Sequence, residues 1–99
     1  MMLLTRDLRR KIPKLYSQEH KKDPIAYVKF FAPSSNWTWY ILEFDGKDTF
    51  FAYVVGLESE LGYVSLRELQ SVRGRWGLGI ERDRHFRPTP LSKIKRGME

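Results

Sequence analysis

The feature that most constrains the fold of this chain is a turn signal between two runs of aromatic and branched residues. Residues 37–44 (WTWYILEF) and residues 50–57 (FFAYVVGL) both have the composition of β-strands, and Asp45-Gly46-Lys47-Asp48 lies between them. Asp-Gly is favoured in tight hairpins because both positions readily take positive φ angles. The two runs are therefore predicted to pair as antiparallel neighbours.

A third run, residues 25–32 (IAYVKFFA), precedes this hairpin, and Pro24 and Pro33 bound it. Ser34-Ser35-Asn36 then forms a turn cluster that is far shorter than the crossover that parallel strands require. We predict an α+β fold with an antiparallel meander sheet of three or more strands over residues 25–57. Residues 61–64 are a short apolar stretch after the meander.

Alternation along the second strand predicts which side chains share a face of the sheet. Trp37, Trp39 and Ile41 are expected on one face. Tyr40, Leu42 and Phe44 are expected on the other. Both faces carry aromatic rings, so each is either covered by other elements or forms an exposed aromatic surface.

Helix signals lie on both sides of the meander. Thr5 predicts an N-capped helix that Pro13 ends near residue 11 or 12, and residues 16–24 are expected to be a polar linker. Ser65-Leu66-Arg67-Glu68 is a capping box, so Ser65 is interpreted as a helix cap and not as a nucleophile. This second helix is predicted to end at Arg73-Gly74 with glycine in the left-handed conformation.

These signals predict one α+β domain over residues 1–99. It comprises a basic helix and linker at 1–22, the antiparallel meander at 25–57, and a helix, a Gly/Arg/Trp loop and a basic tail at 65–99. The hydrophobic share of 41% and the aromatic share of 14% are sufficient for a packed core without disulfides or a structural metal. The tail is expected to contain a final helical turn.

The composition also excludes several classes of protein. The chain has no cysteine, which rules out disulfide frameworks, thiolate zinc sites and cysteine nucleophiles and favours a reducing cytoplasm. Only four apolar residues precede the first charge, far short of the ~20 that a membrane span needs. We therefore expect a cytoplasmic protein with no membrane partner.

The formal charge of +6 is unevenly distributed. Residues 1–22 and residues 65–99 are rich in Lys and Arg, whereas acids outnumber bases in residues 23–64. If both basic ends pack on one side of the sheet, they form a positive face that attracts phosphates. If they lie on opposite sides, they are ordinary solubilising surface.

The most specific arrangement combines aromatic residues with arginines. Single-stranded nucleic acid is held in this way, with bases stacking on rings and arginines contacting phosphates. Core packing is the alternative explanation for the strand tryptophans. The candidate nucleic-acid-binding residues are Arg73, Arg75, Trp76, Arg82, Arg84, Trp37 and Trp39.

No catalytic, metal or cofactor motif is recognised. The glycines at 74, 77 and 79 follow a helix, whereas a phosphate-binding loop precedes one, so they are interpreted as turn residues. The acid pairs have plain local explanations, and His20 and His85 are too far apart to predict a ligand pair. An enzymatic function would require five further residues to line a single pocket. These residues are Glu60, Arg73, Glu81, Arg82 and Asp83.

Several segments together resemble a known family. They are Asp23-Pro24-Ile25, Lys29-Phe30-Phe31, Ser35-Asn36-Trp37-Thr38-Trp39-Tyr40, Glu60-Leu61-Gly62-Tyr63, Ser65-Leu66-Arg67-Glu68-Leu69, Arg73-Gly74 and Gly79-Ile80-Glu81-Arg82-Asp83. Over about residues 12–94 the chain resembles a family of small bacterial proteins known as a domain of unknown function, often encoded on plasmids and mobile elements. The chain differs in its tight Asp-Gly hairpin, where relatives have a longer acidic insertion.

The resemblance implies a bacterial or mobile-element setting and transfers no catalytic residue. Small basic proteins in such a setting commonly handle DNA or interfere with host enzymes. We therefore expect a non-enzymatic accessory module that binds nucleic acid through its basic ends and aromatic residues. The alternative is a protein-interaction module, an inhibitor or adaptor that docks an aromatic strand face on a host or plasmid enzyme.

Overall fold

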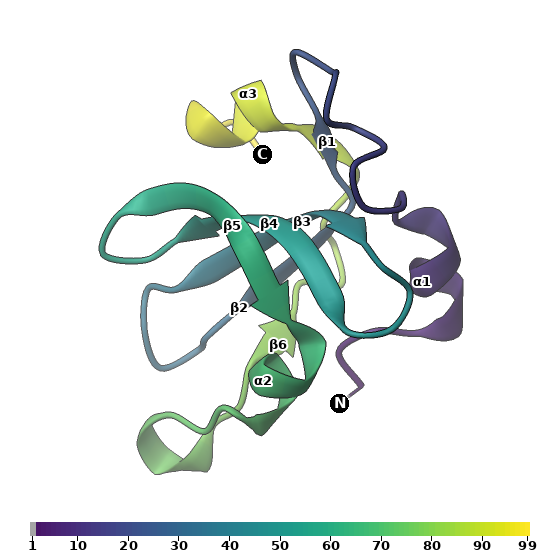
Figure 1. Ribbon diagram of the computed structural model, residues 1–99. Coiled ribbons are helices and arrows are strands. Elements are labelled where there is room, and N and C mark those ends of the chain that lie inside the picture. Colours follow the sequence, from purple (N-terminus) through teal and green to yellow (C-terminus); the bar gives the residue numbers. More distant parts are fainter. Residues whose placement is uncertain (1) are drawn as a thin grey trace.

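The computed structural model describes residues 2–99, which form a curved antiparallel sheet, a short second sheet and three short α-helices (Figure 1). The elements in chain order are α1 (Arg6–Lys11), β1 (Ile25–Ala26), β2 (Val28–Phe31), β3 (Thr38–Phe44), β4 (Thr49–Val55), β5 (Ser59–Ser65), α2 (Leu66–Ser71), the 3-10 turn η1 (Arg75–Gly77), β6 (Glu81–Arg82), β7 (Thr89–Pro90) and α3 (Leu91–Lys95). The main sheet has the order β5-β4-β3-β2-β6, and β1 pairs with β7. The predicted α+β class, antiparallel meander and N-terminal helix are confirmed.

Two strands differ from the sequence prediction. The first predicted run divides at Tyr27, whose N–H donates to the carbonyl of Ile41, and residues 25–26 leave the main sheet to pair with residues 89–90. The apolar stretch at 61–64 is part of β5, which pairs with β4 over its whole length. The meander thus has four consecutive strands, and β6 returns to pair with the first of them.

A β-bulge in β3 changes the predicted faces of the sheet. Ile41 is opposite Ala52, but Glu43 is opposite Phe51, so Leu42 is an extra residue in the ladder. An extra residue reverses the alternation beyond it. Phe44 therefore packs in the same core as Ile41, and its predicted grouping with Tyr40 and Leu42 is wrong.

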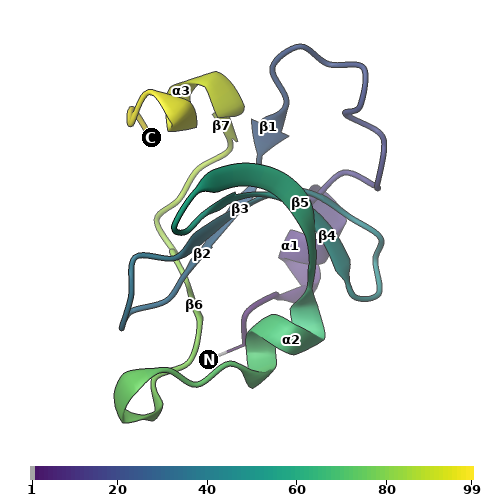
Figure 2. The same cartoon turned by 60° about the vertical axis from the view of Figure 1, so that its left-hand side comes forward.

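The sheet has a hydrophobic core on each face. The first core contains Phe30, Ile41, Phe44 and Phe50 from the strands, covered by Leu3, Leu4 and Ile12 around α1 and by Leu66 and Leu69 of α2. The second core is smaller and contains Ala26, Tyr40 and Leu42 beneath Ile94 of α3. Figure 2 shows α3 above the central strands and α1 and α2 below them.

The basic ends gather only in part on one side of the sheet. α1 and α2 cover the first core, whereas α3 covers the second. The C-terminal basic segment is therefore divided between the two faces. Neither of the two arrangements considered from the sequence is realised in full, since part of the C-terminal segment shares a face with α1 and the rest does not.

The ends of α2 are only partly as predicted. The Ser65 hydroxyl accepts from the Glu68 N–H at 3.2 Å, so its role as a cap is confirmed. The helix ends at Ser71, and Gly74 has φ −92°, so the prediction of a left-handed glycine there is wrong. The Arg73 guanidinium instead donates to the carbonyls of Gln70 and Val72, which satisfies the C-terminal acceptors.

The predicted linker before β1 is fixed by two buried polar side chains. The Glu43 carboxylate accepts from the N–H of Tyr16 at 2.7 Å and of Gln18 at 2.8 Å. The Gln18 side chain donates to the carbonyls of Ile25 and Leu42 and accepts from the Ile25 N–H. Every polar atom of this network has a partner, so the segment is an ordered part of the fold.

The hairpin tip between β3 and β4 also holds the start of α2. Asp48 accepts from the Ser65 hydroxyl at 2.6 Å and from the Arg67 N–H at 2.8 Å. These two hydrogen bonds keep the pKa of Asp48 below its ordinary value of 3.8, and the bond from the Ser65 hydroxyl has the larger effect. The carboxylate form of Asp48 therefore stabilises the junction between β5 and α2.

We expect Glu43→Gln to lower the free energy of unfolding by about 1–3 kcal/mol, because an amide nitrogen cannot accept from the backbone N–H that it would face. Urea denaturation measures the change. Glu60→Gln makes the same chemical change on an exposed side chain and is expected to stay within about 0.5 kcal/mol of the parent. Equal effects of the two substitutions would show that the Glu43 contacts do not stabilise the fold.

The Asp48 contacts also predict a pH dependence of stability. Because the folded pKa of Asp48 is lowered, its contribution is complete above 3.8 and is lost as pH falls through the folded value. Asp48→Asn should therefore flatten the decline of the urea midpoint below that pH. Glu58→Gln is the control, since that carboxylate makes no side-chain hydrogen bond within residues 2–99, and it should leave the slope unchanged.

Candidate nucleic-acid interface

A groove of about 650 Å³ lies between the β2–β3 loop and β6, and we call it the β6 groove. Three of the seven predicted nucleic-acid-binding residues, Trp37, Arg82 and Arg84, line it. The hairpin register places these residues together, because β6 pairs with the end of β2 that leads into the loop. The other lining residues are Lys29, Phe31, Ala32, Ser35, Asn36, Thr38, Glu81, Asp83 and His85.

Trp37 presents a partly open ring to this groove. It is 41% exposed, and its ring stacks on Trp39 with centroids 6.0 Å apart and an interplanar angle of 29°. A Cβ at Gly56 would come within 2.6 Å of the indole, so only glycine permits this packing. Trp39 is half-buried against the first core and does not line the groove; it supports Trp37 from behind.

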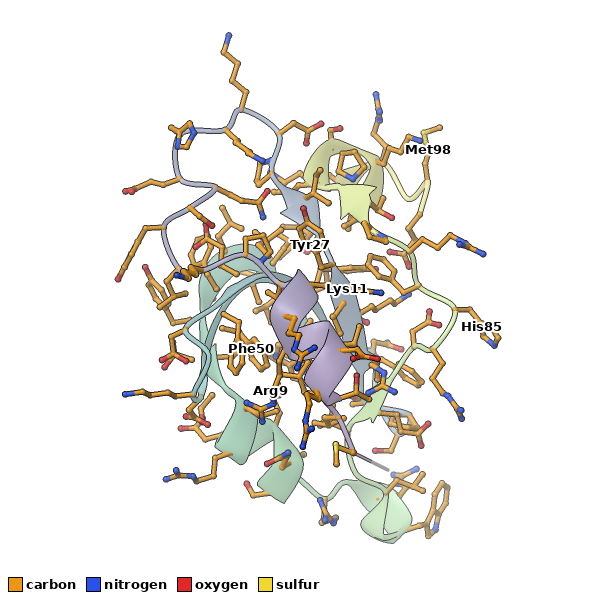
Figure 3. The ribbon with its side chains drawn as sticks, turned by 90° about the vertical axis from the view of Figure 1, so that its right-hand side faces the viewer. Arg9, Lys11, Tyr27, Phe50, His85 and Met98 are labelled. Carbon is orange, nitrogen blue, oxygen red and sulfur yellow. The ribbon has the colours of Figure 1, made fainter. Side chains whose placement is uncertain are left out.

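The two groove arginines have different roles. One guanidinium nitrogen of Arg82 donates to the carbonyls of Met2 and Leu3 at 2.9 and 2.7 Å, so Arg82 holds the N-terminal segment against the first core. Arg84 is exposed and makes no ion pair or side-chain hydrogen bond within residues 2–99. Its neighbour His85 extends away from the ribbon in Figure 3. Arg84 and His85 are therefore free to contact a ligand.

Part of the negative charge in the groove, that of Asp83, is balanced by neighbouring groups of the protein. Asp83 accepts from the His85 N–H at 2.9 Å and lies 4.0 Å from the Lys29 ammonium. Lys29 also pairs with Glu99 and lies 5.5 Å from the centroid of the Tyr40 ring. Burial, followed by a hydrogen bond with Glu99, raises the pKa of Tyr40, so this phenol stays neutral.

The Trp76 loop (residues 72–79) adjoins the β6 groove. A Cβ at Gly74 would lie 2.3 Å from the Ser34 hydroxyl, so the loop packs directly on the β2–β3 loop that carries Trp37. Trp76 is 83% exposed and has φ 58°, and the Arg75 guanidinium lies 5.4 Å from the centroid of its ring. The loop therefore places one open ring and one arginine beside the groove.

Five of the seven predicted residues thus belong to one surface; Arg73 lines a separate hollow beside it, and Trp39 lies beneath it. Arg73 and Arg82 satisfy backbone carbonyls of the fold. Three side chains, Trp76, Arg75 and Arg84, are exposed and are not used in packing the cores. This arrangement can stack planar bases and neutralise phosphates.

Sequence reasoning missed Lys29 and the polar residues Ser35 and Asn36 of the groove. One signal was present, since the turn cluster at residues 34–36 directly precedes Trp37, but the exposure of that ring is visible only in the structure.

A second basic hollow of about 630 Å³ lies between α1 and the β3–β4 hairpin tip. It includes Arg9 and Lys11, which Figure 3 shows on α1.

The residues considered for an enzyme do not meet in one pocket. Glu60 is on β5 at one edge of the sheet, and Arg82 is on β6 at the other. Arg73 and Glu81 share a separate hollow with Leu3 and Ile80. Among residues 2–99, no three His, Asp or Glu side chains are grouped so that they could hold a metal ion, and no helix is long and apolar enough to cross a membrane.

We expect Arg82→Ala to lower the free energy of unfolding by about 1–3 kcal/mol, because two backbone carbonyls lose a charged donor. Arg84→Ala removes the same charge from an exposed side chain and should change stability by less than about 0.5 kcal/mol. Urea denaturation of both variants checks this difference. Equal stability of the two would mean that the Arg82 contacts with residues 2 and 3 contribute nothing.

Comparison with known proteins places the chain in a family but identifies no individual relative. No curated protein and no solved structure was found to match it. A family model described as "Protein of unknown function (DUF2958)" matches residues 3–96, which include both cores and the candidate interface. The chain therefore belongs to this family of proteins of unknown function, as its resemblance to such a family had predicted.

Proposed function

We propose that this protein is a non-enzymatic module that binds single-stranded nucleic acid along the Trp76 loop and the β6 groove. The contact of Gly74 with Ser34 carries the proposal, because it joins the Trp76 loop to the groove in one continuous surface. In this proposal Trp76 and Trp37 stack on bases. Arg75 and Arg84 contact the phosphates between and beside them.

The geometry favours a single strand over a duplex. Trp37 is half-sheltered by Trp39 and Gly56, and its open side faces a groove that unstacked bases can enter. Bases in a duplex are stacked on one another and do not offer their faces to a ring. Base stacking on an aromatic ring contributes about 1–3 kcal/mol per base and tolerates any sequence.

The proposed setting is a bacterial cytoplasm, and the gene is proposed to be carried on a plasmid or other mobile element. The absence of cysteine supports a reducing compartment, and the net charge of +6 supports an anionic partner. A module of this kind protects or presents single strands without catalysing a reaction on them. The binding surface then needs neither a metal nor a cofactor.

Fluorescence anisotropy with labelled single-stranded DNA, single-stranded RNA and duplex DNA tests the proposal. We expect the single strands to bind more tightly than the duplex, with affinity that falls steeply as salt rises. Arg75→Ala and Arg84→Ala should each reduce the slope of log K against log salt by about 0.7. Trp76→Ala should weaken binding by about 5- to 150-fold with little change in that slope.

The controls separate local contacts from net charge. Arg10→Ala removes one arginine from α1, beside the second basic hollow, and should leave single-strand affinity within about twofold if the proposed surface is correct. Arg73 and Arg82 are avoided because both hold the fold together. Equal losses from Arg10→Ala and Arg84→Ala would point to nonspecific charge attraction, and absence of binding at low salt would overturn the proposal.

A further inference from the structure

The two edges of the main sheet are not equally protected. β6 is only two residues long, so one edge offers little backbone for pairing. β5 is seven residues long and forms the other edge; it contains no proline and no bulge, and its one charged side chain is Glu60, near its N-terminal end. Natural edge strands are usually protected by proline, bulges or charged side chains, because unpaired N–H and C=O groups bind other strands. Residues 61–65 of β5 carry none of these protections.

The ladder shows which groups of β5 face outward. The Leu66 N–H donates to the Asp48 carbonyl at 2.8 Å, and these residues continue the β4–β5 register. Because antiparallel pairs alternate, Gly62 turns its backbone groups toward β4, whereas Leu61 and Tyr63 turn theirs outward. The side chains of Leu61 and Tyr63 are 47% and 57% exposed, which agrees with an uncovered edge.

We propose that β5 pairs antiparallel with β5 of a second copy of this chain, about a twofold axis through Gly62. This inference does not depend on nucleic-acid binding. In this register all seven residues of each strand overlap, and Leu61 lies opposite Tyr63 of the partner copy in both directions. Each exposed Leu61 side chain then packs against a Tyr63 side chain of the other copy, on the same face of the sheet. Apolar cross-strand pairs of this kind stabilise sheets.

The charges of the strand do not oppose a second copy. Glu58 and Glu60 lie at the N-terminal end of β5, and Arg67 and Glu68 follow its C-terminal end, beside Asp48. Glu60 lies opposite Val64 of the partner, so no like charges are opposed within the pair. A pairing centred on Leu61 or Tyr63 would overlap fewer residues and place one of these apolar side chains opposite serine.

Cysteine crosslinking tests the register directly, because the chain has no cysteine. In the proposed dimer the two Gly62 residues form a non-hydrogen-bonded pair with Cα atoms about 4.5 Å apart, within the range of a disulfide. No atom lies within 4 Å of a Cβ at this position, so Gly62→Cys is accommodated. Ser59→Cys is the matched control, since its two copies would lie about 20 Å apart.

We expect mild oxidation to crosslink Gly62→Cys at least about tenfold faster than Ser59→Cys. Adding Tyr63→Lys to Gly62→Cys should abolish that advantage, whereas adding Leu78→Lys, a 40% exposed residue of the Trp76 loop, at the β6 side of the sheet, should preserve it. Far-UV circular dichroism confirms that each variant is folded. Equal crosslinking rates for Gly62→Cys and Ser59→Cys would overturn the proposal.

Sedimentation equilibrium of the unmodified chain gives an independent readout. Pairing of one strand edge buries less surface than a standard interface, so we expect a concentration-dependent mixture of the 11.8 kDa chain and its dimer. Tyr63→Lys should shift this mixture to monomer, and Leu78→Lys should not. A wild-type chain that stays monomeric at the concentrations used for crosslinking would contradict the proposal.

Discussion

The β-bulge at Leu42 is the constraint on which the rest of the structure depends. Because it inserts one residue, Phe44 packs in the first core and Glu43 points toward the opposite face. There the carboxylate accepts the backbone N–H groups of Tyr16 and Gln18. Without the bulge the charge of Glu43 would enter the larger core, which is prohibitively unfavourable without a partner. One extra residue therefore settles both the packing of the sheet and the path of the segment that precedes it.

The two cores make the sheet the middle layer of the molecule. Each terminal region supplies a cover, with α1 and its flanking leucines on one face and α3 on the other. This division places the basic residues of α3 on the opposite face from those of α1 and α2. Within residues 2–99, no helix covers the end of the sheet near Trp37 or the long edge at β5.

Local signals in the sequence were sufficient for the hairpin at Asp45-Gly46 and for the caps at Thr5 and Ser65, because each depends on residues close in the chain. The bulge and the order of residues 16–24 were not predictable in this way, since they depend on hydrogen bonds between Glu43 and a distant segment. The left-handed glycine was wrongly predicted at Gly74 because the Arg73 side chain satisfies the helix end instead. The candidate interface was predicted as a set of residues, but separating Arg84 from Arg82 required their contacts.

The return of β6 to β2 has a consequence for the order of folding. β2 lies near residue 30 and its second partner near residue 82, so this edge closes only after most of the chain has been synthesised. The hairpins β2–β3, β3–β4 and β4–β5 involve near neighbours and can form early. Between these events the emerging meander carries an open edge at β2 and an uncovered second face, because the covers of the first face around α1 precede the meander in the chain. The segment from Ile80 to Ile94 therefore closes the β2 edge and covers the second face last, and until then these surfaces are open to aggregation.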